Sequence, residues 1–124
     1  MLPMTLAARL AAQADRLGGK CFFHHGGVAH SYAAVAERAG RVAAGLRALG
    51  ISKGDRVATY MPNGLPLVES YFALATLSAG AVLLNPQLTP REIGYILEDW
   101  APRASSRTPR WCRTCAPCRA RCRR

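Results

Sequence analysis

Apolar and polar positions follow two different periods along the first hundred residues, and the changes of period predict separate helices and strands. Apolar residues recur every three or four positions in four segments, which is typical of helices that bury one side. These segments are residues 6–17, 32–49, 65–78 and 90–100. Short apolar runs between them indicate strands at residues 20–24, 28–31, 56–61 and 81–84. Because strands alternate with helices, the sequence predicts an α/β fold with parallel strands.

Local signals define where several of these helices begin. Thr5 and Ser31 stand where a hydroxyl can cap the helix that follows. The clearest signal is Thr89-Pro90-Arg91-Glu92, in which Thr89 and Glu92 can each bond the backbone amide of the other. Pro90 suits the first helical position, where an amide has no partner within the helix. We therefore expect a firmly capped helix from Pro90 to about Trp100.

Two turns and one buried helix complete the expected organisation. His25-Gly26-Gly27 predicts a hairpin turn, because glycine accepts positive φ values. Residues 52–55 predict a second turn that includes Asp55. The helix over residues 65–78 is apolar almost all round, which predicts burial on more than one side, and Gly80 is expected to stop it.

The long helix over residues 32–49 has a predicted apolar side and a predicted solvated side. Its apolar positions are spaced by four, three, four and three residues. They are Val35, Ala39, Val42, Leu46 and Leu49. The arginines at 38, 41 and 47 are interpreted as the solvated side.

Charge and cysteine content divide the chain at residue 102. Residues 1–102 carry nine Lys and Arg against seven Asp and Glu, whereas residues 103–124 carry eight Arg and no acid. Four of the five cysteines lie in that second part. Residues 1–102 are therefore predicted to form one incomplete domain, and residues 103–124 a disordered basic tail.

The predicted environment is the cytoplasm. No apolar run is long enough to span a bilayer, and no basic stretch precedes an apolar core at the N-terminus. Cys21, the one cysteine outside the tail, fits a reducing compartment and is expected to be a small core residue rather than a nucleophile.

The order of several short segments resembles the N-terminal end of the AMP-forming acyl-CoA synthetases, an adenylate-forming family that includes luciferases and peptide-synthetase adenylation domains. The resemblance covers Thr5 to about Arg103 and depends on the shared order of its pieces. These are Ser31-Tyr32, residues 48–57 (ALGISKGDRV), Met61-Pro62-Asn63, residues 79–86 (AGAVLLNP) and Tyr95-Ile96-Leu97-Glu98-Asp99. The resemblance implies that the fold is the opening portion of the acyl-CoA-synthetase-like large domain.

The resemblance also implies an activity and a set of cofactors. Full-length members activate a carboxylic acid with ATP, form an acyl-adenylate, and pass the acyl group to coenzyme A. Mg²⁺ would offset the phosphate charge. Fatty or aromatic acids are the expected substrates of the full-length family.

The family's nucleotide-binding machinery is not found in this sequence. The Ser/Thr/Gly-rich phosphate loop, the adenine motif and the catalytic lysine are all absent, and Gly18-Gly19-Lys20-Cys21 does not replace the loop because it has neither the spaced glycines nor the hydroxyl residue. We therefore assign no catalytic and no cofactor-binding residue, and we expect no cofactor for this chain. The prediction is a truncated AMP-dependent acid–CoA ligase that is inactive as it stands.

Cys112, Cys115, Cys118 and Cys122 have the spacing of an iron–sulfur run, and a four-cysteine zinc site is a further alternative. Their neighbours are mainly arginine, however, and a cluster needs an apolar shell. Eight arginines with Trp111 could also hold a nucleic acid. A small α/β protein whose basic, Cys-rich tail binds nucleic acid or metal is thus the alternative function.

We favour a third interpretation, in which the tail is read in a shifted frame. Moving the frame by one base after Ala104 converts every Cys codon to one for Leu, Met or Val. The tail would then continue with apolar and polar segments, as the family's next strand would. On this interpretation no specific nucleic-acid binding and no metal are expected.

The remaining expectations concern the histidines and the stability of an incomplete domain. His24, His25 and His30 are interpreted as surface residues of the hairpin rather than metal ligands. Strands that lack their partners leave exposed edges. We expect marginal stability, aggregation and contact with chaperones.

Overall fold

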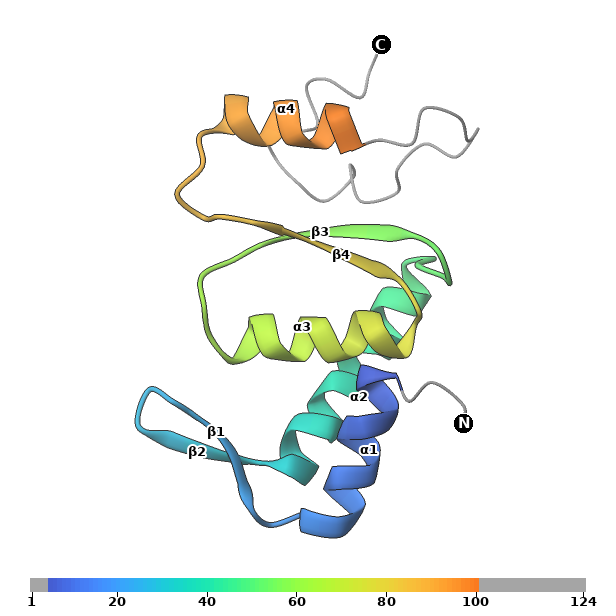
Figure 1. Ribbon diagram of the computed structural model, residues 1–124, viewed down its shortest axis with the longest axis vertical. Helices are drawn as coiled ribbons and strands as arrows, with labels where there is room; N and C mark the ends of the chain where they lie inside the picture. Colours follow the sequence, from blue (N-terminus) through green and yellow to red (C-terminus); the bar gives the residue numbers. More distant parts are fainter. Residues whose placement is uncertain (1–4, 101–124) are drawn as a thin grey trace.

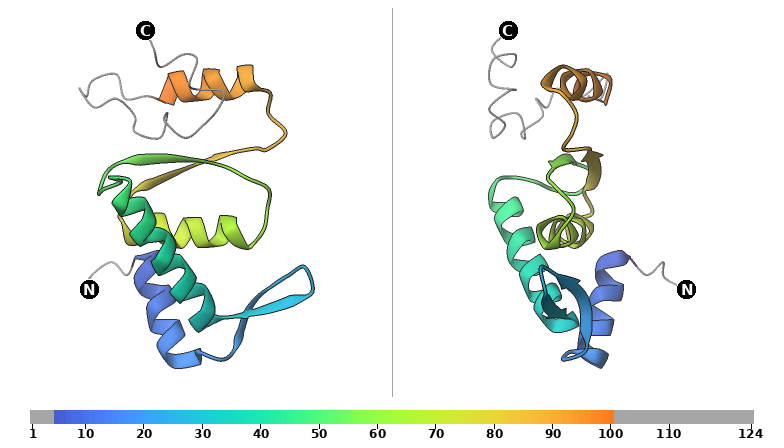
Figure 2. Two further views of the ribbon diagram at one scale, coloured as in Figure 1. Left: turned by 180° about the vertical axis from the view of Figure 1, so that it is seen from behind. Right: turned by 90° about the vertical axis from the view of Figure 1, so that its left-hand side faces the viewer.

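A computed structural model describes residues 5–100, except for the side chain of Trp100. Four helices and four strands make up this part of the chain, and they alternate from α2 onwards. They are α1 (Leu6–Leu17), β1 (Cys21–His25), β2 (Val28–Ser31), α2 (Tyr32–Ala48), β3 (Arg56–Tyr60), α3 (Leu65–Thr76), β4 (Gly80–Leu84) and α4 (Pro90–Trp100). Figure 1 shows a layered arrangement in which α4 covers one side of the β3–β4 pair and α3 lies on the other. The helices α1 and α2 and the β1–β2 hairpin lie beyond α3, and the two views of Figure 2 agree.

The β3–β4 pair has the parallel arrangement that the sequence predicts. Arg56 lies opposite Gly80, and the register continues without a break to Tyr60 opposite Leu84. Helix α3 forms the crossover between the two strands, as a parallel pair requires. The fold is therefore α/β, and β3–α3–β4 is its central unit.

The first two strands form a separate antiparallel hairpin. Gly26 and Gly27 have φ values of +58° and +78°, which confirms that glycine is used for its left-handed conformation. His25, which was expected in the turn, instead ends β1 and pairs with Val28. The hairpin thus has a two-residue turn, and β1 runs one residue further towards it than predicted, whereas β2 begins at Val28 as predicted.

The predicted caps of the first two helices are present. The hydroxyl of Thr5 accepts a hydrogen bond from the amide of Ala8 at 3.2 Å, and that of Ser31 accepts one from Ala34 at 3.2 Å. Both caps satisfy amides that the helix itself leaves without partners.

The ends of α2 and α3 differ from the predictions. Leu49 is 67% exposed because it follows the last helical residue, and the core side of α2 runs through Val35, Ala39 and Ala43 at intervals of four. The turn after α3 is made by Ser78, whose φ is +54°, whereas Gly80 is already the first residue of β4. Ser78 therefore occupies the left-handed position at which glycine was expected.

Three apolar clusters form the core and follow the layers. The first joins α1, α2 and the start of α3, and the second joins α2, α3 and β3. The third lies between α4 and the opposite side of the sheet. Helix α3 contributes to the first two clusters, which confirms that it is buried on more than one side. Cys21 belongs to none of them: it is exposed, so its prediction as a core residue was wrong, because β1 lies at the surface.

No helix among residues 5–100 is both long and apolar enough to cross a membrane.

The capping box of α4 is formed, and its carboxylate makes the stability of the start of this helix depend on pH. The carboxylate of Glu92 accepts hydrogen bonds from the amide and the hydroxyl of Thr89, both at 2.8 Å, while the Glu92 amide approaches the same hydroxyl at 3.4 Å. The backbone bond, followed by the side-chain bond, holds the pKa of Glu92 below its ordinary value. A lowered pKa in the folded state means that this stabilisation is complete above the ordinary glutamate pKa and is lost as pH falls through the lowered one.

We therefore expect acid to loosen the first turn of α4. Amide hydrogen exchange, followed by NMR from about pH 6 to about pH 3, should show protection of the Ile93 amide decreasing towards acid after correction for the intrinsic rate. Glu92→Gln, which cannot ionise, should flatten that dependence. An equal pH dependence in both proteins would contradict a role for the Glu92 carboxylate.

Candidate functional site

The polar side chains of the described residues do not converge on one catalytic pocket. Among residues 5–100, no group of three or more His, Cys, Asp or Glu side chains is placed to hold a metal ion. The alternative metal ligands Cys112, Cys115, Cys118 and Cys122 lie outside the described residues, as does Trp111.

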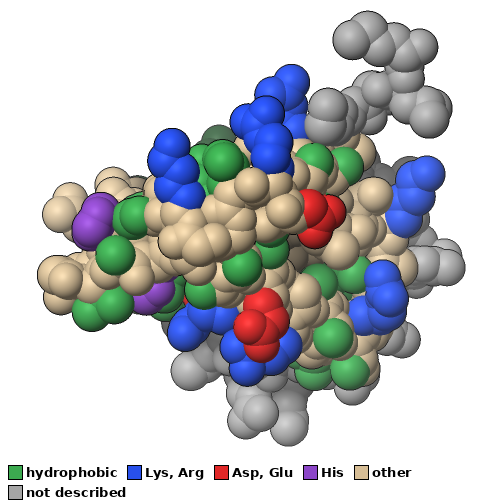
Figure 3. Space-filling model, turned by 90° about the horizontal axis from the view of Figure 1, so that it is seen from below, with side chains coloured by type: hydrophobic (Ala, Val, Ile, Leu, Met, Phe, Trp, Pro, Cys, Tyr) green, Lys and Arg blue, Asp and Glu red, His purple; other side chains and the backbone are tan. Residues whose placement is uncertain are grey.

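The three histidines lie on the hairpin, as predicted. His24 and His25 are exposed, and His30 is half-buried. The rings of His25 and His30 lie beside that of Phe23, with centroids 6.0 and 6.4 Å from it. Figure 3 shows histidine side chains on the projecting end of this face, while basic and acidic side chains are dispersed over the rest. His25 and His30 thus pack beside an aromatic ring, whereas His24 is exposed.

The segment Gly18-Gly19-Lys20-Cys21 leads from α1 into β1 and is not a phosphate cradle. The carbonyl of Gly18 accepts a hydrogen bond from the amide of Ala33, and the carbonyl of Lys20 accepts one from Tyr32, both at 3.1 Å. The Lys20 amide itself donates to Leu17 at 2.6 Å. These bonds fasten the start of α2 to the end of α1, and the segment does not fit a nucleotide phosphate.

The turn before β3 aligns the central strands. Asp55 accepts hydrogen bonds from the amide and hydroxyl of Ser52 at 2.7 and 2.9 Å. The carbonyl of Asp55 accepts from the amide of Gly80 at 2.8 Å, and the Gly54 amide donates to Ser78 at 3.0 Å. The turn role predicted for Asp55 is confirmed, and the same residue sets the register between β3 and β4.

Glu69 is a buried carboxylate that the sequence analysis did not identify. It lies on α3 with its side chain 8% exposed, and it accepts a short hydrogen bond from Nε of Arg38 on α2, whose side chain is 47% exposed. Arg38 is exposed, as predicted for the solvated side of α2, but it also pairs with this buried carboxylate, which was not predicted. Arg41, by contrast, faces solvent and pairs loosely with Glu37 at 3.5 Å. The signal in the sequence that could have identified Glu69 was that it is the single acidic residue in a mostly apolar helix.

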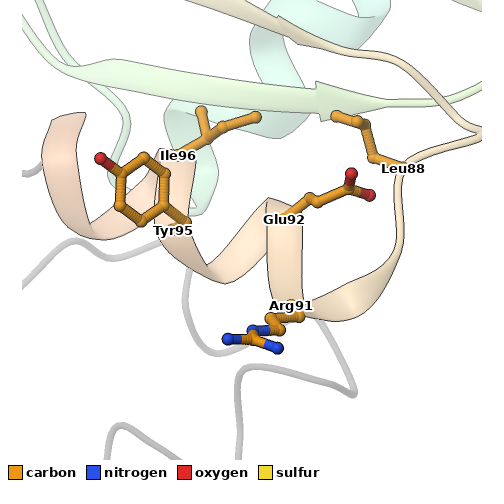
Figure 4. A pocket seen from close by; sticks show the side chains of 5 residues that line it. All are labelled: Leu88, Arg91, Glu92, Tyr95 and Ile96. Carbon is orange, nitrogen blue, oxygen red and sulfur yellow. The ribbon is translucent and has the colours of Figure 1, made fainter.

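A shallow groove lies beside α4. Leu88, Arg91, Glu92, Tyr95 and Ile96 line it. In Figure 4, Leu88 and Ile96 lie between the helix and the sheet, whereas Arg91 points away from them. The carboxylate of Glu92 is already engaged by Thr89. With an apolar lining and one committed carboxylate, the groove offers a packing surface and no pair of groups for acid–base chemistry.

Comparison with known proteins shows where this arrangement recurs. A family described as AMP-binding enzyme matches residues 10–109, past the domain boundary predicted at residue 102. A long-chain-fatty-acid–CoA ligase of Thermus thermophilus is 48% identical over 75 residues, covering 59% of this chain and 14% of that protein. A feruloyl-CoA synthase of an Amycolatopsis species is 39% identical over 92 residues, covering 74% of this chain and 19% of that protein.

The fold recurs in a solved structure of a fatty acyl CoA synthetase of Mycobacterium tuberculosis. The TM-score is 0.74 with 34% sequence identity, and the match covers 77% of this chain and 20% of that one. The region of similarity thus spans between 14 and 20% of these three relatives.

Proposed function

Because the chain belongs to the AMP-binding enzyme family, we propose that it is the opening structural part of the large domain of an AMP-forming acid–CoA ligase. The complete reaction would use ATP and Mg²⁺ to convert a carboxylic acid to an acyl-adenylate, and coenzyme A would then take the acyl group as a thioester. The single observation that carries the proposal is that sequence and fold agree: the family matches residues 10–109, and a fatty acyl CoA synthetase shares the fold over 77% of this chain.

This segment would contribute scaffold rather than catalytic groups. The side chains with defined partners serve the fold: Asp55 aligns two strands, Glu69 binds Arg38 between two helices, and Glu92 caps α4. The described residues do not provide a set that fits nucleotide phosphates or Mg²⁺. We therefore expect the 124-residue chain to catalyse neither adenylate formation nor thioester formation, and ATP, Mg²⁺ and coenzyme A to be handled by other parts of a complete ligase.

The acid that a complete ligase would take is proposed only as a class. The relatives are named for long-chain fatty acids and for ferulic acid, which share a carboxylate attached to a large apolar body. A cytoplasmic location remains a proposal. The shifted-frame interpretation concerns residues 103–124, which lie outside the described residues, and it also remains a prediction.

A chimera tests the proposal. In the Thermus thermophilus ligase, the matching 75-residue segment is replaced by that of this chain, and ATP–pyrophosphate exchange is measured with a long-chain fatty acid. The chimera should remain active, whereas the 124-residue chain measured by itself should show no exchange. The control chimera carries Ala73→Asp, which places a charge at a site of 0% exposure and should abolish folding and activity. A chimera that folds but does not catalyse exchange would contradict the proposal.

A further inference from the structure

In one cross-strand pair of the central sheet, the polar residue is buried and the apolar residue is exposed. Thr59 on β3 lies opposite Leu83 on β4, so both side chains lie on the same side of the sheet. Thr59 is 5% exposed, with its hydroxyl 3.3 Å from the carbonyl of Val82, whereas Leu83 is 58% exposed. The hydrophobic effect favours the reverse arrangement, because burying a leucine side chain contributes about 2 kcal/mol.

The same side of the sheet is covered at β3 and exposed at β4. Val57 of β3 packs into the cluster formed by α2 and α3, and Thr59 shares its side of the strand. On β4 the residues on that side are Ala81 and Leu83, and both are exposed. The opposite side of β4 is covered by α4, since Val82 and Leu84 pack against it. On this side of the sheet β3 is thus covered, whereas the side of β4 that carries Ala81 and Leu83 is open.

The outer edge of β4 is also open in the part of the chain that the structure describes. Its one strand partner there is β3, and the pair forms a two-stranded sheet. Parallel sheets normally contain more strands and have both faces covered. The open edge of β4 and the exposed leucine beside it therefore form a surface suited to packing against further protein.

We propose that the open side of β4, defined by Ala81 and Leu83, is the docking surface for the remainder of an acyl-CoA ligase large domain presented as a separate polypeptide. This rests on the proposed function. The occupant is inferred from two observations: the similarity spans 20% of the solved fatty acyl CoA synthetase, and the fold is retained within that span at a TM-score of 0.74. We then expect the surface that is open in this segment to contact the part of a whole ligase domain that completes the sheet.

A second copy of the chain fits this surface less well. A twofold axis perpendicular to the sheet would join two β4 edges as antiparallel strands, whereas the sheet that β3 and β4 begin is parallel. The ligase remainder can supply a strand in the parallel sense together with an apolar cover for Leu83. The partner is thus a polypeptide with an exposed strand edge and an apolar surface beside it.

The experiment is co-expression of the full 124-residue chain with the Thermus thermophilus ligase from which the matching 75-residue segment has been deleted. We expect the two polypeptides to co-purify at one-to-one stoichiometry. Leu83→Asp should weaken capture by at least about tenfold, because a carboxylate would be buried at the contact. Leu49→Asp makes the same chemical change at a site of 67% exposure at the end of α2 and should leave capture unchanged. Ala81→Asp, on the same side of β4, should act like Leu83→Asp.

Each outcome of this experiment either supports or contradicts the proposed docking surface on β4. Circular dichroism must first show that Leu83→Asp folds like the parent chain, as expected for an exposed site; if it does not, Ala81→Asp takes its place in the comparison. Absence of capture, or equal capture by the β4 variants and Leu49→Asp, would overturn the proposed surface. So would Leu83-dependent self-association of the chain without the ligase fragment. An active covalent chimera alongside failed capture would reject docking while leaving the proposed function intact, whereas a folded, inactive chimera would reject both.

Discussion

Replacing Leu74 with alanine is expected to lower the free energy of unfolding by about 3 kcal/mol. Leu74 is 1% exposed and is one of the two largest fully buried side chains, the other being Val35. It lies in the second half of α3, the helix that packs against α1 and α2 and forms the crossover between the two central strands. Truncation removes the transfer free energy of the lost methyl groups and leaves a cavity that neighbouring elements can fill only in part.

Urea unfolding followed by circular dichroism measures this effect. Leu49→Ala makes the same truncation at a residue that is 67% exposed, and it should change the free energy of unfolding by less than about 0.5 kcal/mol. Small domains are stable by only about 5–15 kcal/mol, so the Leu74 variant should have a far lower urea midpoint than the control. Similar midpoints for the two variants would show that α3 is not the packing centre of this fold.

The features that the sequence predicted are those decided within a few residues. Thr5 and Ser31 cap their helices, the pair Gly26-Gly27 turns the hairpin, and the box from Thr89 to Glu92 starts α4. In each case a side chain or backbone group meets a partner two to four positions away. The spacing in the sequence is then the spacing in space, and no knowledge of the tertiary fold is needed.

The features that the sequence did not predict depend on which surfaces of the helices and strands pack together in the tertiary fold. The apolar pattern extended α2 to Leu49, but the helix ends at Ala48 and no neighbour covers the next residue. Cys21 was expected in the core because a small thiol usually packs there, yet β1 lies at the surface. Glu69 is buried because α2 passes over it and supplies Arg38, thirty-one residues earlier in the chain. Periodicity identifies the buried side of a helix but not the charged residue that faces it.

The same distinction applies to function. The family resemblance rested on the order of short segments, and it is confirmed by the match over residues 10–109 and by the solved synthetase structure. The open side of β4 could not be predicted, because Ala81 and Leu83 belong to a short apolar run, which indicates a strand but not which of its sides is covered. Their exposure depends on how the helices pack on the two sides of the sheet, which the tertiary fold determines.

The ion pair between α2 and α3 provides the second large effect. Replacing Arg38 with methionine is expected to lower the free energy of unfolding by about 2 kcal/mol, because it leaves the Glu69 carboxylate, 8% exposed, without its cation. A fully buried pair would cost about 3–5 kcal/mol to break in this way, whereas an exposed pair contributes at most about 1 kcal/mol. The Arg38 side chain is 47% exposed, so water can partly replace it and an intermediate value is expected.

A double-mutant cycle separates the pair from the packing of its two side chains. Glu69→Leu with Arg38→Met removes both charges while keeping apolar volume between the helices, and it should recover most of the loss caused by Arg38→Met. Arg41→Met removes a cation one turn away whose partner Glu37 has a side chain that is 71% exposed, and it should cost no more than about 0.5 kcal/mol. If the double variant is no more stable than Arg38→Met, the pair does not act through the desolvated carboxylate. The methylene stem of Arg38 would then be what holds α2 against α3.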